Sequence, residues 1–247
     1  MPKSSFNYQA VAGDYQYRAM LAGPPLQRFW HTGKLLVWDE LIAPRVRNEP
    51  QFPLIEVGCG AGLLLQHLVQ EPVLKVGTDI NFQALRFLNQ RFIDIGNPQL
   101  FLAIMSKGEQ LPFKDDYFGG VILSEVIEHL SHPEILLNEA YRILRPGGWC
   151  YITTPNYRSF WPFLEKFIDR LDLAPRMAGE QHISLFDQKK LIRLLKDWQL
   201  EILTSFYCFS PLFSMISMNW GKRLLKRECR SNNKSGMLLA CLARKSH

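Results

Sequence analysis

The first residues that could do chemistry form a glycine-rich segment, Glu56-Val57-Gly58-Cys59-Gly60-Ala61-Gly62, between two apolar stretches. Glycine at alternate positions lets the backbone turn tightly and present its N–H groups to a ligand, because no Cβ atom stands in the way. A helix that begins directly after the turn adds a partial positive charge, which favours a bound carboxylate or phosphate. The segment therefore predicts a nucleotide-binding turn.

An acidic residue at the end of the next apolar stretch specifies the ligand further. Residues 74–77 are followed by Thr78 and Asp79, about seventeen positions after Gly62. In α/β nucleotide-binding folds, a carboxylate at the tip of the second strand binds the ribose hydroxyls. The dinucleotide fingerprint has its third glycine one position later, where this chain has Leu63. A NAD-dependent dehydrogenase is therefore disfavoured.

The pattern Glu-x-Gly-x-Gly-x-Gly resembles motif I of the class I S-adenosylmethionine-dependent methyltransferases. Three later segments resemble further motifs of this family in order and spacing: residues 108–118, the apolar residues 120–123, and the turn at residues 144–148. The likeness is to methyltransferases of type 11 and of ubiquinone biosynthesis. It implies an α/β, Rossmann-like fold with a mostly parallel seven-stranded sheet, an antiparallel last strand and helices on both faces. It also implies S-adenosyl-L-methionine as the methyl donor.

The composition excludes several other classes of protein. A chain of 247 residues with 47% hydrophobic and 21% charged residues is typical of one globular domain with an appended piece. The five cysteines form no C-x-x-C pair, so neither a disulfide framework nor a cysteine zinc site is predicted. No apolar core of a signal peptide and no run of about 18 apolar residues is present. We expect a cytoplasmic protein that contacts membranes peripherally at most.

The apolar pattern predicts the elements that must position the site. From Pro53 onward strands and helices alternate, which indicates a mainly parallel sheet with helices on both faces. The predicted strands are residues 54–58, 74–79, 99–105, 120–124, 149–154, 201–207 and 237–243. The predicted helices are residues 61–70, 82–94, 133–144 and 188–198, the last with Asp187 as its N-cap.

The chain is predicted to divide into an N-terminal helical cap, residues 1–50, and a Rossmann-like core, residues 51–247. Apolar residues recur at spacings of three and four in the cap, after the start signal Pro24-Pro25. The core carries insertions at about residues 156–186 and 209–235. The first insertion follows the fifth strand and would lie over the ligand-binding edge of the sheet. It is either a substrate lid or a packing segment.

The resemblance also implies roles for single residues around the cofactor. Arg28 is similar to an arginine that meets the cofactor's carboxylate in ubiquinone-biosynthesis O-methyltransferases, and a solvated surface arginine is the alternative. Where many relatives have an aspartate that accepts from the adenine amino group, this chain has Lys107, which cannot accept a hydrogen bond. The implied cofactor-binding residues are Arg28, Glu56, Gly58, Cys59, Gly60, Gly62, Asp79, Ile80, Asn81, Lys107, Gly108, Glu109 and Ser124.

Two carboxylates and an imidazole follow the fourth predicted strand, in Glu125-Val126-Ile127-Glu128-His129. On a helix, positions i, i+3 and i+4 share one face, so Glu125, Glu128 and His129 would converge. The same pattern binds a divalent metal in ubiquinone-pathway and small-RNA methyltransferases, so the resemblance implies a Mg²⁺ site that would lower the pKa of an acceptor hydroxyl. His182 could add a further imidazole. The alternatives are that His129 or His182 is a general base, or that these residues are structural.

These features favour an enzyme that transfers a methyl group from S-adenosylmethionine to a small, apolar acceptor, with O-methylation preferred. The aromatic cap, the first insertion and residues 209–220 favour an apolar pocket. The net charge of +6 is concentrated in basic residues between 222 and 245. This patch favours contact with a membrane surface or, alternatively, a nucleic-acid methyltransferase. A methyltransferase-like partner subunit without activity is a further alternative, and the sequence specifies neither the acceptor nor an oligomeric state.

Overall fold

The computed structural model describes residues 7–47, 52–170, 181–231 and 233–246, apart from the side chains of residues 168 and 169. Seven strands form one sheet in the order β3-β2-β1-β4-β5-β7-β6, and β7 is antiparallel to both of its neighbours. The strands are β1 (Leu54–Val57), β2 (Lys75–Asp79), β3 (Phe101–Met105), β4 (Phe118–Ser124), β5 (Leu144–Pro155), β6 (Gln199–Phe206) and β7 (Leu238–Arg244). The predicted fold class, with its antiparallel last strand, is confirmed.

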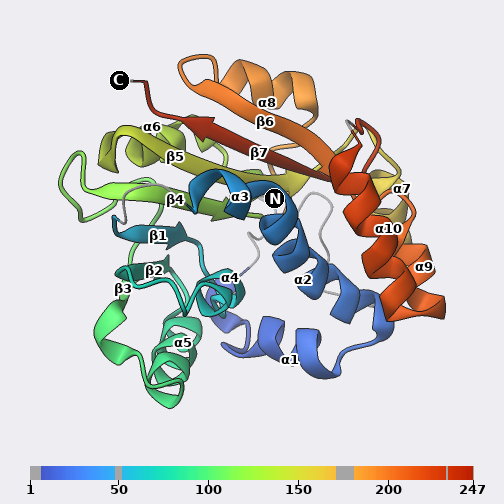
Figure 1. The fold of residues 1–247 in the computed structure, drawn as a ribbon, viewed down its shortest axis with the longest axis horizontal. Helices are drawn as coiled ribbons and strands as arrows, with labels where there is room; N and C mark the ends of the chain where they lie inside the picture. The colour runs from blue at the N-terminus through green and yellow to red at the C-terminus, as the bar shows by residue number, and fades with distance from the viewer. Residues whose placement is uncertain (1–6, 48–51, 171–180, 232, 247) are drawn as a thin grey trace, which may run out of the picture.

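Helices lie on both faces of the sheet and around one of its edges (Figure 1). None of the helices within the described residues is both long enough and apolar enough to cross a membrane. The α-helices are α1 (Tyr15–Ala22), α2 (Pro25–Val37), α3 (Ala43–Val46), α4 (Leu63–His67), α5 (Phe82–Asp94), α6 (Pro133–Ile143), α7 (Trp161–Arg170), α8 (Gln188–Leu194), α9 (Ser210–Ile216) and α10 (Met218–Arg230). A π-helical turn, η2 (Trp38–Ile42), and three 3₁₀ turns, η1 (Tyr8–Ala10), η3 (Pro98–Leu100) and η4 (Ile127–His129), complete the set.

The core has one apolar layer on each face of the sheet. On one face, Leu136 of α6 and Leu191 of α8 pack in a buried cluster with the central strands. On the other face, Phe29 of α2 and Leu225 of α10 join Tyr151 of β5. Strands buried on both faces are rich in apolar residues along their whole length, which explains why these segments were recognisable in the sequence.

The ends of several elements differ from the prediction. The helix predicted over residues 61–70 is confined to α4, because Gly62 keeps a left-handed backbone (φ +63°) and belongs to the preceding turn. Asp187 is the N-cap of α8 as predicted, since its Oδ1 accepts a hydrogen bond from the Lys190 N–H at 2.7 Å. Parts of the predicted cap (1–6 and 48–50) and of the two insertions (171–180 and 232) lie outside the described residues, and the division into cap and core stays a prediction.

The parallel strands β1, β4 and β5 end at the same edge of the sheet as β6. The strand order reverses between β1 and β4, and open α/β sheets bind ligands at such a switch point, outside the carboxyl ends of the strands. In Figure 1, α2, α9 and α10 lie at the side toward which β4 and β5 point. These helices therefore lie on the same side of the molecule as the ligand-binding edge of the sheet.

Candidate active site

The glycine turn after β1 has the conformation that its sequence predicts. Gly58, Gly60 and Gly62 all have positive φ angles, of 67°, 49° and 63°. A Cβ atom on Gly58 would lie 2.7 Å from the Val126 side chain, and one on Gly62 would lie 2.4 Å from that of Leu88. Both the left-handed backbone and the close packing therefore require glycine. The turn also lies directly against the segment that contains Glu125, Glu128 and His129.

Asp79 ties the tip of β2 to this turn. Its Oδ2 accepts a hydrogen bond from the Gly60 N–H at 2.8 Å, and its Oδ1 accepts one from the Asn81 N–H at 2.7 Å. The Asn81 side chain caps α5 and donates to the main-chain carbonyls of Tyr8 and Val11. Each carboxylate oxygen of Asp79 keeps a lone pair for a further donor such as a ribose hydroxyl.

A small cavity of about 40 Å³ lies beneath the turn, between β1, β4, β5 and α2. Within the described residues, three buried polar atoms that border it have no hydrogen-bond partner: Glu56 Oε2, His31 Nδ1 and the Tyr151 hydroxyl. Buried polar groups are normally hydrogen-bonded, so these three atoms could each form a hydrogen bond with a polar ligand. Lys34 borders the same cavity and forms an ion pair with Glu125.

Burial shifts the pKa values of the groups around this cavity. Desolvation raises the pKa of Glu56 to about 8, although the Lys34 ammonium opposes the shift. Desolvation lowers the pKa of His31 to about 3, and Lys34 adds to this effect. Burial alone would raise the pKa of Glu125, but the ion pair with Lys34 holds it below its usual value. A cation that reached Glu56 would stabilise its ionised form.

Gln16 of α1 also lines this cavity. Its Oε1 accepts a hydrogen bond from the Ala61 N–H at 3.2 Å and lies 2.7 Å from where a Cβ on Gly60 would be. Ligand pockets have volumes of roughly 300–1,000 Å³, so a cavity of about 40 Å³ cannot enclose a nucleoside. The orphaned Glu56 and His31 atoms fit a polar cofactor. Its entry requires that Gln16 and the segment that carries it move away from the turn.

The other predicted cofactor residues surround the same edge. The loop with Lys107, Gly108 and Glu109 follows β3, and the Ser106 N–H donates to the Asp79 carbonyl at 3.2 Å, which places the loop beside the tip of β2. Ile80 is exposed next to Asp79, whereas Cys59 is buried in the turn. Ser124, at the end of β4, shares a hydrogen bond of 3.1 Å with the Thr153 hydroxyl.

Arg28 is exposed on α2, three residues before His31. Positions i and i+3 lie on one helix face, so its side chain is one turn from the cavity. No ion pair involves it among the described residues.

The expected convergence of Glu125, Glu128 and His129 on one helix face is wrong. Glu125 has a left-handed backbone (φ +55°), and only Ile127–His129 form a short 3₁₀ turn. Glu125 therefore points to Lys34 of α2, whereas Glu128 and His129 approach His182 of the first insertion. Ligand atoms of Glu128, His129 and His182 all lie within 4.8 Å of one another. The structure thus replaces Glu125 with His182 in this group.

Hydrogen bonds fix the three side chains of this group. The Glu128 carboxylate accepts from the Thr154 hydroxyl at 3.0 Å. His129 Nδ1 lies 2.9 Å from both the Tyr8 hydroxyl and the Gln181 carbonyl. His182 Nδ1 lies 2.6 Å from Glu165 Oε1 and 2.7 Å from the Tyr157 hydroxyl, and that hydroxyl donates to Glu165 at 2.7 Å.

The electrostatics of the group leave His129 uncharged at neutral pH. Desolvation raises the pKa of Glu128 to about 8, and Glu125 contributes to the rise. Desolvation lowers the pKa of His129 to about 4. Burial would also lower the pKa of His182, but the hydrogen bond with Glu165 raises it above its usual value. An uncharged imidazole at neutral pH can accept a proton.

The donor set does not fit the predicted Mg²⁺ ion. Mg²⁺ requires near-octahedral coordination by oxygen, and Glu128 alone of the three residues offers oxygen. Two imidazoles and a carboxylate are donors of the kind that Zn²⁺ or Fe²⁺ takes.

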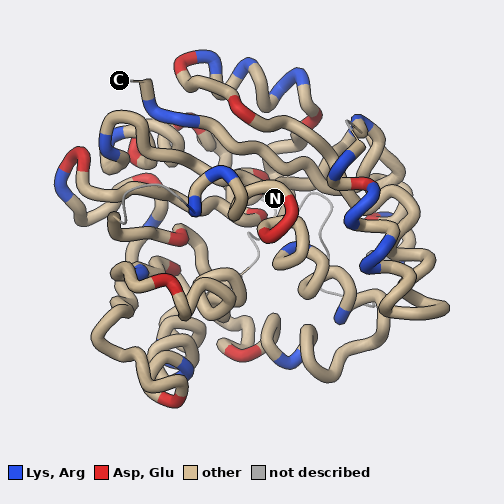
Figure 2. The backbone as a smooth tube through the Cα atoms, viewed as in Figure 1, with Lys and Arg blue, Asp and Glu red and all other residues tan. Residues whose placement is uncertain are grey.

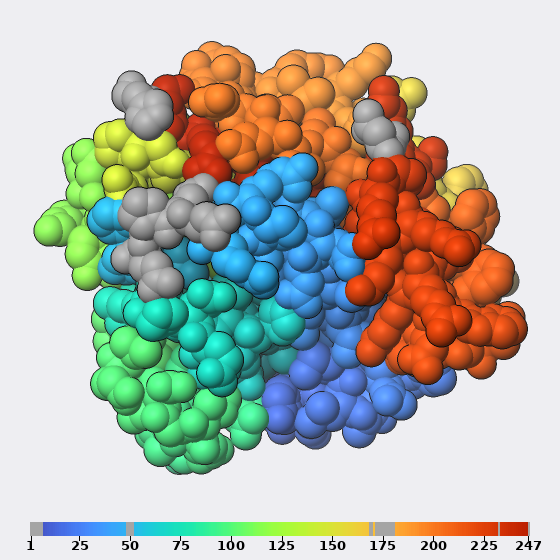
Figure 3. Space-filling view, viewed as in Figure 1, coloured from blue at the N-terminus to red at the C-terminus, as the bar shows by residue number. Residues whose placement is uncertain are grey.

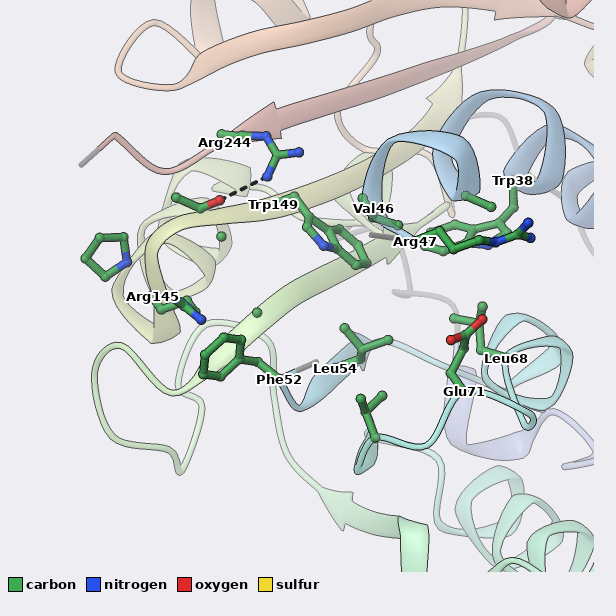
Figure 4. A pocket seen from close by; sticks show the side chains of 16 residues that line it. Trp38, Val46, Arg47, Phe52, Leu54, Leu68, Glu71, Arg145, Trp149 and Arg244 are labelled. Carbon is green, nitrogen blue, oxygen red and sulfur yellow. Dashed lines mark hydrogen bonds between the residues drawn. The ribbon is translucent and has the colours of Figure 1, made fainter. Parts of the chain in front are cut away.

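A larger cavity of about 400 Å³ lies at the opposite edge of the sheet (Figure 4). Leu54 at the start of β1, Trp149 and Arg145 line it, together with Trp38 and Arg47 from the N-terminal helices. The Arg145 guanidinium lies over the Phe52 ring, 3.5 Å from its centroid. Since the strands begin here and end at the glycine turn, this cavity is separate from the residues described above.

The partners of the predicted residues come from elements far away in the sequence. Tyr8, Gln16, His31 and Glu165 carried no motif, and only their amphipathic or aromatic surroundings marked their segments. Lys34 pairs with a carboxylate 91 positions away. A single sequence contains no signal for such contacts.

The sheet order and the glycine turn at the carboxyl edge of the sheet are those of α/β proteins that bind a nucleotide or nucleoside cofactor. Residues 28–205 match the family described as a methyltransferase domain, and the chain belongs to this family. It is a class I S-adenosylmethionine-dependent methyltransferase, with S-adenosylmethionine as the implied methyl donor.

Known proteins similar to the chain include methyltransferases of quinone biosynthesis. The mitochondrial ubiquinone biosynthesis O-methyltransferase of Mus musculus is 30% identical over 125 residues, which cover 48% of this chain and 34% of that protein. The ubiquinone/menaquinone biosynthesis C-methyltransferase UbiE of Burkholderia orbicola is 24% identical over 66% of this chain and 63% of that protein. The match thus spans about a third of the mouse protein's length.

The crystal structure of the cyclase SpnF superimposes with a TM-score of 0.63 at 16% identity, over 88% of this chain and 82% of that one. This likeness concerns the fold, which supports more than one reaction.

Proposed function

We propose that the chain transfers the methyl group of S-adenosylmethionine to a hydroxyl oxygen of a small, apolar acceptor. The observation that carries the proposal is the group of buried Glu128 and His182 with half-buried His129 beside the glycine turn. A hydroxyl is a weak nucleophile until its proton is removed, so a neutral base in a buried site suits O-methylation. The mouse O-methyltransferase among the similar proteins is in keeping with this proposal.

The cofactor would be held by residues that the site already orients. When bound, S-adenosylmethionine supplies an electrophilic methyl group on its sulfonium. Asp79 would accept hydrogen bonds from the ribose, Glu56 would face the positively charged end, and Arg28 would bind the carboxylate. Lys107, Gly108 and Glu109 would border the adenine through backbone groups.

His129 would act as the general base on the acceptor hydroxyl. Its pKa of about 4 keeps it uncharged at neutral pH. Glu165 and Tyr157 would hold His182 in place beside it, and the protonated carboxyl of Glu128 could donate a hydrogen bond to the acceptor. Correct alignment of donor and acceptor contributes the larger share of such catalysis, up to ~7–11 kcal/mol.

The test combines cofactor titration with product analysis. Calorimetry should show that S-adenosylmethionine binds the wild-type chain and that Asp79→Ala abolishes the binding. Phenolic acceptors with hydrocarbon tails of increasing length should then yield O-methyl products by mass spectrometry, with higher turnover for the longer tails. His129→Ala should lower the rate by roughly 10²–10⁴-fold.

His132→Ala is the matched control, because His132 lies three residues further on and is exposed. Methylation at carbon or nitrogen, or full activity of His129→Ala, would contradict the proposal. A rate that falls with a chelator would instead assign Glu128, His129 and His182 to a metal.

A further inference from the structure

Helix α9 presents its large apolar side chains to solvent. Leu212, Met215 and Ile216 are 61%, 61% and 74% exposed, whereas the residues that α9 buries are Ser210, Pro211 and Ser214. A helix that served only to pack would bury its large apolar side chains instead. The surface of α9 is therefore inverted with respect to an ordinary amphipathic helix of the core.

Specific contacts with α10 hold α9 in this orientation. The buried carboxylate of Glu228 accepts hydrogen bonds from the N–H groups of Phe209 and Ser210, each at 2.9 Å, and from the Ser210 hydroxyl at 2.8 Å. A Cβ on Gly221 would lie 2.6 Å from the Ser214 Cβ, so the two helices are in close contact. Small residues of α9 therefore fill its interface with α10, and the large apolar side chains of α9 face solvent.

The neighbouring helix α10, which packs against α9, carries basic residues. Arg223 and Arg227 are exposed on α10 and form no ion pair within the described part of the chain, whereas Lys226 and Arg230 both pair with Glu40. Figure 2 shows the cations following one another along α10. Figure 3 shows that α9 and α10, coloured orange to red, form one side of the molecule. Trp220, 54% exposed, lies on α10 as well.

We propose that the α9–α10 surface, residues 209–227, binds the surface of an anionic lipid bilayer. Apolar side chains beside cations match the acyl boundary and the anionic headgroups of such a surface. The free cations favour an anionic bilayer over a second copy of this chain, because two copies would bring the same positive charges together. The proposal rests on this surface alone and does not depend on the acceptor.

The location of the surface makes the binding useful. α9 follows β6, whose carboxyl end lies at the same edge as those of β4 and β5, and α9 and α10 pack against α2. Exposed aromatic side chains also lie in α7, which follows β5, and just before it: Phe160, Phe163 and Phe167 are 66%, 68% and 58% exposed. A bilayer on α9 and α10 would therefore lie beside the ligand-binding edge of the sheet.

Vesicle flotation of the full chain tests the proposal. Vesicles of phosphatidylcholine with phosphatidylglycerol should carry the protein, vesicles of phosphatidylcholine alone should carry far less, and added salt should weaken the binding. Each basic residue near such a surface contributes about fivefold to the partition coefficient, so Arg223→Gln/Arg227→Gln should lower it by about 25-fold. Met215→Ser/Ile216→Ser should remove the binding.

Matched controls make the test specific. Lys189→Gln/Arg193→Gln removes two exposed cations of α8, and Ile93→Ser removes an exposed apolar side chain of α5 (48%). Neither should change flotation. Titration with S-adenosylmethionine shows that every variant is folded and separates this test from that of the methyltransferase. Equal flotation of all variants would overturn the proposal. It would also be overturned if the protein did not float and instead formed a dimer in solution that Ile216→Asp dissociates.

Discussion

Glu56 should make cofactor binding dependent on pH. Its carboxyl group is buried, its Oε2 has no partner, and burial raises its pKa to about 8. A positively charged ligand beside it should return the pKa to near its ordinary value of 4.5 or lower. Below pH 8 the cofactor must therefore displace a proton, so its affinity should rise with pH and level off above that value.

The size of the effect follows from the pKa. About two pH units below the pKa, roughly 99% of the Glu56 carboxyl groups are protonated, and this costs about a hundredfold in affinity. Wild-type protein should therefore bind S-adenosylmethionine up to about 100-fold more weakly at about pH 6 than at about pH 9, apart from the titration of the cofactor itself.

The assay is calorimetric titration of wild type, Glu56→Gln and Glu134→Gln across this range. Glu134 is an exposed carboxylate and serves as the control. The ratio of wild-type to Glu56→Gln affinity cancels the titration of the cofactor's own amino group. If this ratio stays constant with pH, Glu56 does not face the cation and the argument fails.

Three further substitutions test other contacts of the site. Lys34→Met leaves the carboxylate of Glu125 without its partner and should lower the free energy of unfolding in urea by about 3 kcal/mol, part of which Lys34→Met/Glu125→Gln should restore. Gly62→Ala places a Cβ against Leu88 in a left-handed backbone and should lower the midpoint of thermal unfolding, with a cost of about 2 kcal/mol or more, whereas Gly96→Ala meets no neighbouring atom and should cost less. Arg28→Ala should raise the Kd for S-adenosylmethionine by about tenfold or more in calorimetry, and an unchanged Kd would return Arg28 to a solvated surface position.

The sequence predicted the part of the fold that depends on local pattern. Alternating apolar stretches gave the parallel strands, and the positive φ angles of Gly58, Gly60 and Gly62 follow from glycine's unique freedom. Asp187 could be recognised as an N-cap because its partner is only three residues away. Such features need no knowledge of what packs against them.

The candidate catalytic group could not be predicted in the same way. A helix was the natural interpretation of the spacing of Glu125, Glu128 and His129, yet Glu125 takes a left-handed backbone and pairs with Lys34. The contacts of His182 with Glu165 and Tyr157 join residues that lie 17 and 25 positions apart within the first insertion. The pairing of Glu125 with Lys34 and the contacts of His182 are tertiary contacts, which local propensity does not predict.

Helix α2 connects the cofactor site with the proposed lipid surface, so the two should be coupled. One side of α2 carries His31 and Lys34 at the cavity, and the helix also packs against α9 and α10. The Tyr207 hydroxyl donates to the Trp30 carbonyl at 2.6 Å and lies 2.4 Å from where a Cβ on Gly33 would be, which fixes α2 against the end of β6. We therefore expect that phosphatidylglycerol vesicles change the Kd for S-adenosylmethionine.

Thermodynamic linkage makes this expectation strict. If vesicles strengthen cofactor binding by some factor, the cofactor must strengthen vesicle binding by the same factor. Calorimetry with vesicles and flotation with S-adenosylmethionine measure the two sides independently, and Gly33→Ala, which forces Tyr207 away from α2, should reduce both factors equally. Unequal factors would mean that the vesicles bind the cofactor directly, whereas equal factors below one would mean that lipid and cofactor oppose each other's binding. Factors of one on both sides would show that α2 transmits nothing between the two sites.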